Sequence, residues 1–303
     1  MNIVGIDIGA SNLRIVLSDR SGRLREVSSE KTNAAELMEQ IFAGLRRLSG
    51  FDAIGIAAVG PLDVKEGVIL NPPNVRVRNL EIVRLVRTRF KRPCYLVNDC
   101  VAAVLGEKMF GAGRGVPNLV YVTLSTGVGC GVIVDGRVLQ GKDGNAHEIG
   151  HCTVDVSGAL RCGCGSYGHW EAYCGGAHIP AFARLLLRTE YRHAASALRG
   201  ARRTLSPEAL FRAARSDRVA AQIVERIGMF NGVGVANAIN AYDPELVTIG
   251  GPIALRHARE VMTPIRRHAR RYAINRVPRI VLTPLKDLVV VYGAVASVLS
   301  RHA

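Results

Sequence analysis

The stretch that most constrains this chain runs from residue 147 to residue 171. It reads H-E-I-G-H at 147–151 and C-G-C-G-S-Y-G-H-W-E at 162–171, so thiols, imidazoles and carboxylates alternate with glycines. Two thiolates and two imidazoles are ligands that tetrahedral Zn²⁺ prefers, and a site filled by four protein ligands is structural. The predicted ligands are His151, Cys162, Cys164 and His169.

Cysteine is also common in protein cores, and a lone histidine is usually a hydrogen-bonded structural residue. The glycine-rich context argues against that interpretation, because such a turn cannot bury these side chains as an apolar face. Three alternative ligands remain, His147, Cys152 and Cys174. The carboxylates of Glu148 and Glu171 are left for another partner. Since carboxylate oxygens accept hydrogen bonds from hydroxyls, a sugar is the expected ligand.

A Glu-x-x-His step, then Cys-x-Cys-Gly-x-x-Gly, one more ligand and a glutamate two residues later resemble the zinc motif of the ROK family. That family comprises transcriptional repressors and sugar kinases. His169 departs from the motif, because the family usually has a third cysteine there, and His147 stands where a small residue is more common. The resemblance implies that Glu148, His151 and Glu171 bind a sugar.

A chain of 303 residues is long enough for two domains. Its seven cysteines are an odd number, no secretory signal precedes the first predicted strand, and no apolar run reaches the length of a membrane span. These observations predict a cytoplasmic protein without disulfides and without a membrane partner.

The net charge of +15 would suit nucleic-acid binding, since Lys and Arg neutralise phosphates. The arginines are instead distributed over predicted helical segments at 184–203, 212–226 and 256–271, and no aromatic side chains alternate with them. We therefore expect no specific nucleic-acid partner.

An apolar strand at 1–10 carries Asp7 and Gly9 near its end, and a second strand is predicted at 13–18. The turn between them offers backbone N–H groups and small polar side chains to a phosphate, while Asp7 can hold Mg²⁺ through water. A structural hairpin explains the same pattern about equally well. The D-x-G-x-S-N sequence is similar to the first phosphate loop of the actin-like ATPase superfamily, to which ROK proteins belong. That resemblance assigns to ATP the residues Asp7, Gly9, Ser11 and Asn12.

Loops rich in proline and asparagine follow the buried strand predicted at 54–59. They read G-P-L-D at 60–63 and N-P-P-N at 71–74. Such loops are often only turns. In ROK kinases the corresponding loops edge the sugar pocket, so the resemblance implies that Gly60 and Asn74 bind the sugar.

The strand predicted at 94–97 delivers Asn98 and Asp99 at its carboxyl end. Ligands of open α/β sheets collect at such ends. Asp99 can instead serve only as the cap of the helix that follows at 101–110. In ROK kinases an Asn-Asp pair before an alanine-rich helix binds the sugar, and its aspartate is the catalytic base. The resemblance carries these roles to Asn98 and Asp99.

A second glycine-rich segment, S-T-G-V-G-C-G at 125–131, joins strands expected at 119–124 and 132–135. Alternate glycines let a backbone approach an anion closely. Because the segment joins two strands, it is not a dinucleotide-binding fingerprint, and it resembles the second phosphate loop of actin-like ATPases. A Gly-Gly step after the strand predicted at 246–249 flanks adenosine in the family. On this basis the residues assigned to ATP are Thr126, Gly127, Gly129, Gly250 and Gly251.

These patterns predict an α/β protein with the two-lobed actin-like ATPase (ribonuclease H-like) fold, a central cleft and a structural zinc site. The smaller lobe is expected at 1–115, with a terminal amphipathic helix within 290–303 packing back on it, and the larger lobe at 116–289. Arginine-rich helical structure is expected up to residue 203, and one continuous helix at 256–272.

The resemblance implies ATP-dependent phosphorylation of a hexose at its 6-hydroxyl, with Mg²⁺ and a structural Zn²⁺, and glucose is the expected sugar. The alternatives are kinases of N-acetylmannosamine, allose or fructose, and a sugar-sensing regulator. Such regulators carry an N-terminal helix-turn-helix, whereas the first strand here is expected to start at residue 2. A zinc hydrolase would need an open coordination position, which four protein ligands close. ROK proteins are often dimers or tetramers, so a homo-oligomer is expected.

Overall fold

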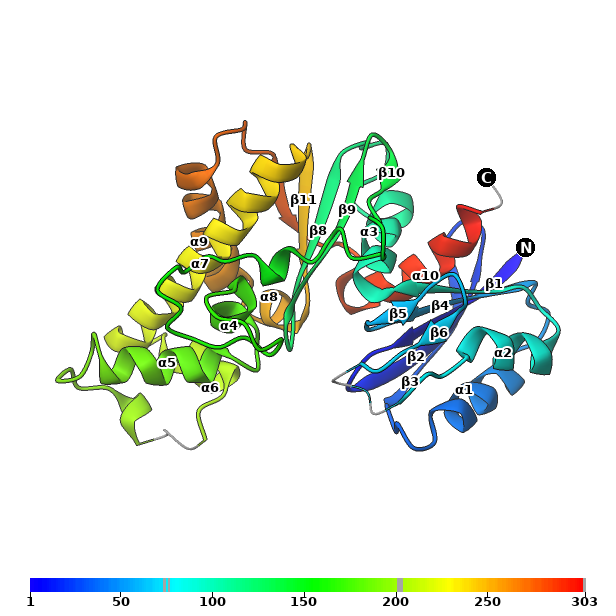
Figure 1. The fold of residues 1–303 in the computed structure, drawn as a ribbon, viewed down its shortest axis with the longest axis horizontal. Coiled ribbons are helices and arrows are strands. Elements are labelled where there is room, and N and C mark those ends of the chain that lie inside the picture. The colour runs from blue at the N-terminus through cyan, green and yellow to red at the C-terminus, as the bar shows by residue number, and fades with distance from the viewer. Residues whose placement is uncertain (73–74, 76, 201–203, 302–303) are drawn as a thin grey trace. The chain divides into compact units, whose positions relative to one another are not determined.

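The structure is a computed structural model that describes residues 1–72, 75, 77–200 and 204–301. Asn74, predicted to bind the sugar, lies outside this described part. The chain divides into two compact units, one formed by Met1–Val116 with Asp287–Ala303 and the other by Pro117–Lys286. Figure 1 shows the blue N-terminal strands and the red C-terminal helix within the first unit. Both units are mixed α/β.

The first unit is built on a five-stranded sheet, counted over the described residues, in the order β3-β2-β1-β4-β7. β1 to β3 form an antiparallel meander, while β4 and β7 continue parallel to β1. β1 is buried on both faces, as its apolar sequence NIVGIDI requires. The strands are β1 (Asn2–Ile8), β2 (Asn12–Asp19), β3 (Leu24–Lys31), β4 (Ala53–Ala58) and β7 (Cys94–Asn98), with β5 (Leu62–Asp63) and β6 (Val68–Ile69) as a separate pair.

The helices of the first unit are α1 (Leu37–Arg46), α2 (Ile82–Phe90), α3 (Asp99–Phe110) and α10 (Val289–Leu299), preceded by the 3₁₀ turn η3 (Lys286–Leu288). The terminal helix was expected to be amphipathic, and this expectation is wrong. Nearly all of α10 is buried, including Val291, Ala294 and Val298, because it packs on β1, β4 and α3. A helix that is apolar on all sides belongs in a core.

The second unit holds a five-stranded sheet within the described residues, in the order β10-β9-β8-β11-β12. β8 pairs antiparallel with β9 and parallel with β11, which pairs parallel with β12. The strands are β8 (Leu119–Leu124), β9 (Val128–Val134), β10 (Arg137–Val138), β11 (Leu246–Gly250) and β12 (Arg279–Leu282).

Two helices of the second unit, α6 and α7, begin at residues whose side chains cap them. Asp217 accepts hydrogen bonds from the backbone N–H groups of Val219 and Ala220 at the start of α7, and Ser206 precedes a proline at the start of α6. The helices are α4 (Trp170–Cys174), α5 (Ile179–Arg188), α6 (Pro207–Ala213), α7 (Arg218–Tyr242), α8 (Pro252–Arg256) and α9 (Ala258–Tyr272), with 3₁₀ turns η1 (Ile149–His151) and η2 (Ala197–Arg199).

One helix prediction in this unit is wrong and another needs a shifted start. The arginine-rich stretch is not helical up to residue 203, because α5 ends at Arg188 and only the short η2 follows before residues 201–203, which lie outside the described part. The helix expected at 256–272 is present as α9 and begins two residues later, at Ala258, because the backbone angles of His257, φ −125° and ψ 44°, are not helical. Apolar periodicity alone does not locate such breaks.

The carboxyl ends of parallel strands meet at one edge of each sheet. In the first unit Ile8 pairs with Ala58, and Ala58 with Asn98. In the second, Thr123 pairs with Gly250. The residues that follow at these edges include Gly9, Gly60 and Asp99 in the first unit and Ser125, Thr126 and Gly251 in the second.

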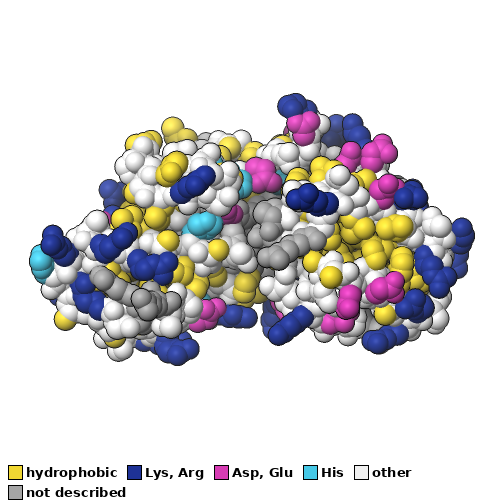
Figure 2. All heavy atoms as spheres, turned by 60° about the horizontal axis from the view of Figure 1, so that its bottom comes forward, with side chains coloured by type: hydrophobic (Ala, Val, Ile, Leu, Met, Phe, Trp, Pro, Cys, Tyr) yellow, Lys and Arg dark blue, Asp and Glu magenta, His cyan; other side chains and the backbone are white. Residues whose placement is uncertain are grey.

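On one face of the molecule, the positive charges of the described residues are dispersed. Figure 2 shows Lys and Arg side chains spread over the visible face among uncharged and acidic ones. Among the helices that the structure describes, none is both long and apolar enough to cross a bilayer.

Candidate functional site

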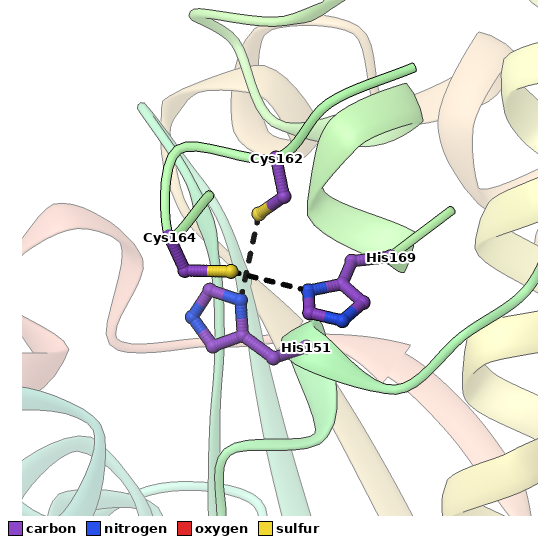
Figure 3. Close-up of side chains that lie close together, drawn as sticks. All are labelled: His151, Cys162, Cys164 and His169. Carbon is purple, nitrogen blue, oxygen red and sulfur yellow. Dashed lines mark hydrogen bonds between the residues drawn. The ribbon is translucent and has the colours of Figure 1, made fainter. Parts of the chain in front are cut away.

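A cluster of two cysteines and two histidines lies in the second unit. His151 ends η1, Cys162 and Cys164 lie in the loop that follows, and His169 directly precedes α4. All four potential ligand atoms lie within 4.8 Å of one another. Sγ of Cys162 lies 3.5 Å from Nδ1 of His151, and Sγ of Cys164 lies 3.3 Å from Nδ1 of His169, as Figure 3 shows.

The spacing of these atoms fits zinc. Bonds of about 2.0–2.1 Å to nitrogen and about 2.3 Å to sulfur place tetrahedral ligands about 3.3–3.8 Å apart. Burial raises the pKa of Cys162 to about 12, so its thiolate needs a neighbouring cation. Burial and the nearby His151 lower the pKa of His169, which favours the neutral imidazole that binds metals. The shift of His169 thus favours the form that binds metal, whereas that of Cys162 opposes the thiolate in the absence of a cation.

The three alternative ligands lie outside this cluster as it is formed by the described residues. Cys174 is buried in α4, and its thiol donates to the carbonyl oxygen of Ile227 at 3.5 Å. Cys152 is exposed, whereas His147, two residues before η1 in the sequence, is buried. Spacing along the sequence left this choice open, and the packing of the described residues brings His151, Cys162, Cys164 and His169 together without these three.

The cluster is anchored to the core through α4. Trp170, next to the ligand His169, is fully buried, and its Nε1 donates to Oδ1 of Asn231 in α7 at 2.9 Å. Complete burial of a large apolar side chain contributes about 1.5–3 kcal/mol, and the hydrogen bond satisfies the indole N–H. One turn of helix therefore holds both His169 and Glu171 in place.

Two carboxylates border the cluster. Oε2 of Glu171 accepts from the backbone N–H of Val128 at 3.1 Å, and its Oε1 accepts from the Cys162 thiol at 3.3 Å. Oε2 of Glu148 lies 3.7 Å from Nε2 of His151. His151 thus directs Nδ1 to the cluster and Nε2 toward an exposed carboxylate. The carboxylates of Glu148 and Glu171 therefore place hydrogen-bond acceptors next to the Cys/His cluster.

The second glycine-rich segment is a shorter turn than expected. β9 already begins at Val128, so Gly129 lies in the strand, and only residues 125–127 form the turn. Gly127 has no room for a side chain, because a Cβ there would overlap Oε2 of Glu171. Gly251 has a positive φ of +86°, and a Cβ there would overlap the carbonyl oxygen of Leu124. Close backbone approach and the positive φ require glycine at position 251, whereas a side chain at position 127 would have to displace the Glu171 carboxylate.

At the edge of the first sheet, Asp7 lies opposite Arg14 of β2. Nη1 of Arg14 donates to Oδ2 of Asp7 at 3.1 Å, and its Nη2 lies 3.8 Å from Oδ2 of Asp287. Burial raises the pKa of Asp7 to about 6, although the charge of Arg14 acts in the opposite direction. Arg14 therefore stabilises the ionised carboxylate at the base of the turn.

Asn98, and not Asp99, is the N-cap of α3. Oδ1 of Asn98 accepts from the backbone N–H groups of Cys100 at 2.9 Å and Val101 at 3.2 Å. Its Nδ2 lies beside Gly60, 3.7 Å from the position that a Cβ would occupy there. Oδ1 of Asp99 accepts from the same Cys100 N–H at 2.9 Å, so Asp99 takes part in capping α3 although Asn98 is the N-cap residue.

Comparison with known proteins decides the family. A sequence profile of the ROK family matches residues 3–300 of the chain. The chain belongs to the ROK family. It is 42% identical over 255 residues to a glucokinase of Pyrobaculum calidifontis, covering 83% of this chain and 79% of that protein. It is 36% identical over 286 residues to a glucokinase of Aeropyrum pernix, covering 89% and 88%.

A ROK structure is similar over the full length of both chains. The ROK family glucokinase from Streptomyces griseus, solved in complex with glucose and AMPPNP, gives a TM-score of 0.82 at 30% identity and 100% coverage of each chain. The mixed α/β fold described above is therefore the ROK sugar kinase fold.

Sequence reasoning missed several residues of this ROK protein that support the candidate sites. Backbone N–H groups of Gly176 and Ala177 donate to the carbonyl oxygens of Ser125 at 2.8 Å and Thr126 at 3.0 Å, which fixes the second glycine turn. The Gly-Gly step after α4 was the available signal. Arg14 carried no local signal, because its role depends on strand pairing with Asp7.

Proposed function

We propose that this ROK protein is a glucokinase that transfers the γ-phosphoryl group of ATP to the 6-hydroxyl of glucose. The similarity to two glucokinases supports the choice of sugar. The observation that carries the proposal is the position of Asp99 at the carboxyl end of β7, directly after the capping residue Asn98. A kinase needs a carboxylate base at such a position, whereas a sugar-sensing regulator does not.

In the proposed reaction Asp99 accepts the proton of the 6-hydroxyl while the oxygen attacks the γ-phosphorus in line. General-base catalysis contributes a factor of about 10² to 10⁴, so the positioning of both substrates supplies the larger share. Asn98 uses Oδ1 for the helix cap and keeps Nδ2 for a sugar hydroxyl. Gly60 lies beside that amide.

Glu148, His151 and Glu171 are proposed to bind sugar hydroxyls, and Asn74 is assigned to the sugar by the family resemblance alone. His151 would use Nδ1 for zinc and Nε2 for the sugar, a division supported by the directions of its two nitrogens. Zinc, when bound, supplies a four-coordinate cross-link that rigidifies the loop of residues 151–169. His151, Cys162, Cys164 and His169 would hold it.

ATP is proposed to bind to the glycine turns of an actin-like ATPase fold. Mg²⁺, when bound, offsets phosphate charge, and Asp7 would hold it through water. The backbone N–H groups of the turns would bind the phosphates. The proposed nucleotide residues are Asp7, Gly9, Ser11, Asn12, Thr126, Gly127, Gly129, Gly250 and Gly251.

A hexose panel tests the proposal. With ATP and Mg²⁺ we expect glucose to have the highest kcat/KM, measured as ADP release, among glucose, fructose, allose and N-acetylmannosamine. A panel in which another sugar exceeds glucose tenfold would assign the enzyme to that sugar instead. Absence of ADP release with every sugar would favour a regulator.

Gly127→Ala tests the proposed role of Glu171. The added methyl group displaces the Glu171 carboxylate and removes its hydrogen bond to Val128 N–H. Charge-assisted hydrogen bonds contribute about 1.5–3 kcal/mol, so the KM for glucose should rise about tenfold or more. Because Gly127 is also a proposed nucleotide residue, the KM for glucose is measured by steady-state kinetics at saturating ATP. Gly200→Ala is the matched control, because a Cβ there comes no closer than 3.8 Å to any atom of the described residues beyond its chain neighbours. Equal KM values in the two variants would remove Glu171 from the sugar site.

A further inference from the structure

A threonine outside the predicted motifs contacts the first glycine turn twice. Thr32 directly follows the last residue of β3. This strand pairs with β2 of the β1–β2 hairpin. Its Oγ1 donates to the carbonyl oxygen of Gly9 at 2.7 Å. Its backbone N–H donates to the carbonyl oxygen of Ser11 at 3.1 Å. One residue therefore holds two of the carbonyl groups of the turn.

These two bonds also set the direction of two donors. A trans peptide group is planar, so its N–H points opposite to its C=O. Fixing the carbonyl of Gly9 fixes the N–H of Ala10, and fixing the carbonyl of Ser11 fixes the N–H of Asn12. Both N–H groups consequently point away from Thr32. A phosphate accepts hydrogen bonds and is repelled by carbonyl oxygens, so this orientation favours anion binding.

Thr32 is itself held from both sides by α1. Nε2 of Gln40 donates to the carbonyl oxygen of Lys31 at 2.9 Å, and its Oε1 accepts from the backbone N–H of Asn33 at 2.9 Å. The residues before and after Thr32 are thus bound to one amide side chain. A donor held in this way loses little entropy when it orients its partner.

We propose that Thr32 is a positioning residue for the nucleotide, whose hydroxyl holds the Gly9–Asn12 turn in the orientation that binds ATP phosphates. The inference rests on the proposed function, which assigns this turn to ATP. Thr32 acts through the turn and needs no contact with the nucleotide. A fixed turn binds more tightly because the cost of ordering it is already met.

The test compares Thr32→Val, which keeps the shape and loses the hydroxyl, with Thr32→Ser, which keeps the hydroxyl. The dissociation constant of the non-hydrolysable analogue AMPPNP is measured by calorimetry, with and without Mg²⁺, alongside that of glucose. Thr32→Val should weaken AMPPNP binding about tenfold under both conditions, the size expected for one lost hydrogen bond. Glucose binding should change less than about twofold, and Thr32→Ser should restore AMPPNP binding.

Ser28→Ala is the matched control, because Oγ of Ser28 donates to the carbonyl oxygen of Ile15 at 3.3 Å on the same strand pair, away from the turn. It should leave AMPPNP binding unchanged. Gln40→Leu should weaken AMPPNP binding about threefold, and it serves as the second variant if Thr32→Val does not fold.

Three outcomes separate the possibilities. Equal AMPPNP binding by Thr32→Val and the unaltered protein overturns the inference alone. Parallel losses of AMPPNP and glucose binding would overturn it as well, since they indicate a general structural role. Failure of the unaltered protein to bind AMPPNP would contradict the proposed function and, with it, the role of Thr32.

Discussion

Asp99→Asn is expected to lower kcat by a factor of about 10² to 10⁴ while glucose binding changes less than about threefold. The amide has nearly the shape of the carboxylate and still forms hydrogen bonds, but it cannot accept the proton of the 6-hydroxyl. Steady-state ADP release gives kcat, and calorimetric titration with glucose gives the dissociation constant.

Asp143→Asn is the matched control, because Asp143 is an exposed aspartate of the second unit paired only with Lys142 in the described structure. Its kcat should equal that of the unaltered protein. Undiminished turnover in Asp99→Asn would exclude a general base at this position. Loss of glucose binding together with turnover would instead make Asp99 chiefly a binding group.

His169→Ala is expected to remove most of the bound zinc and most of the activity. The variant lacks one of the four proposed zinc ligands. Mutating residues that only hydrogen-bond to metal ligands lowers metal affinity about 10- to 100-fold, so removing a ligand should lower zinc affinity further. Activity should fall with the metal, because Glu171 lies two residues away on α4 and His151 belongs to both the cluster and the proposed sugar site. Elemental analysis for zinc and ADP release measure the two effects.

Two further substitutions make this experiment specific. His169→Cys restores the ligand that ROK proteins usually have and should keep both zinc and activity, since nitrogen and sulfur ligands differ by only about 0.3 Å in bond length. Cys174→Ser should keep zinc, because the Cys174 thiol is buried and donates to the carbonyl oxygen of Ile227. Full zinc in His169→Ala together with its loss in Cys174→Ser would replace His169 by Cys174 as the fourth ligand.

The sequence could identify features that depend on short stretches of chain. The strand at Leu119–Leu124 follows from a continuous apolar run, and the structure has it with the same bounds. The Cys-x-Cys pair and its two histidines come within 4.8 Å of each other because glycine-rich turns bring nearby ligands together. The Asn98-Asp99 pair likewise follows from a strand that leads directly into a helix.

Contacts between segments that are far apart in the sequence determined the remaining features of the sites and the fold. The ion pair of Arg14 with Asp7 depends on the register of β1 and β2, and the contacts of Thr32 with Gly9 and Ser11 depend on the neighbouring β3. The burial of α10 requires two strands and a helix that precede it by about 180 residues or more along the chain. Periodicity within one segment reports which side chains are apolar, but the surface that covers them is supplied by other segments. For that reason the sequence determined the chemistry available at these sites, and only the tertiary structure decided which groups hold one another in place.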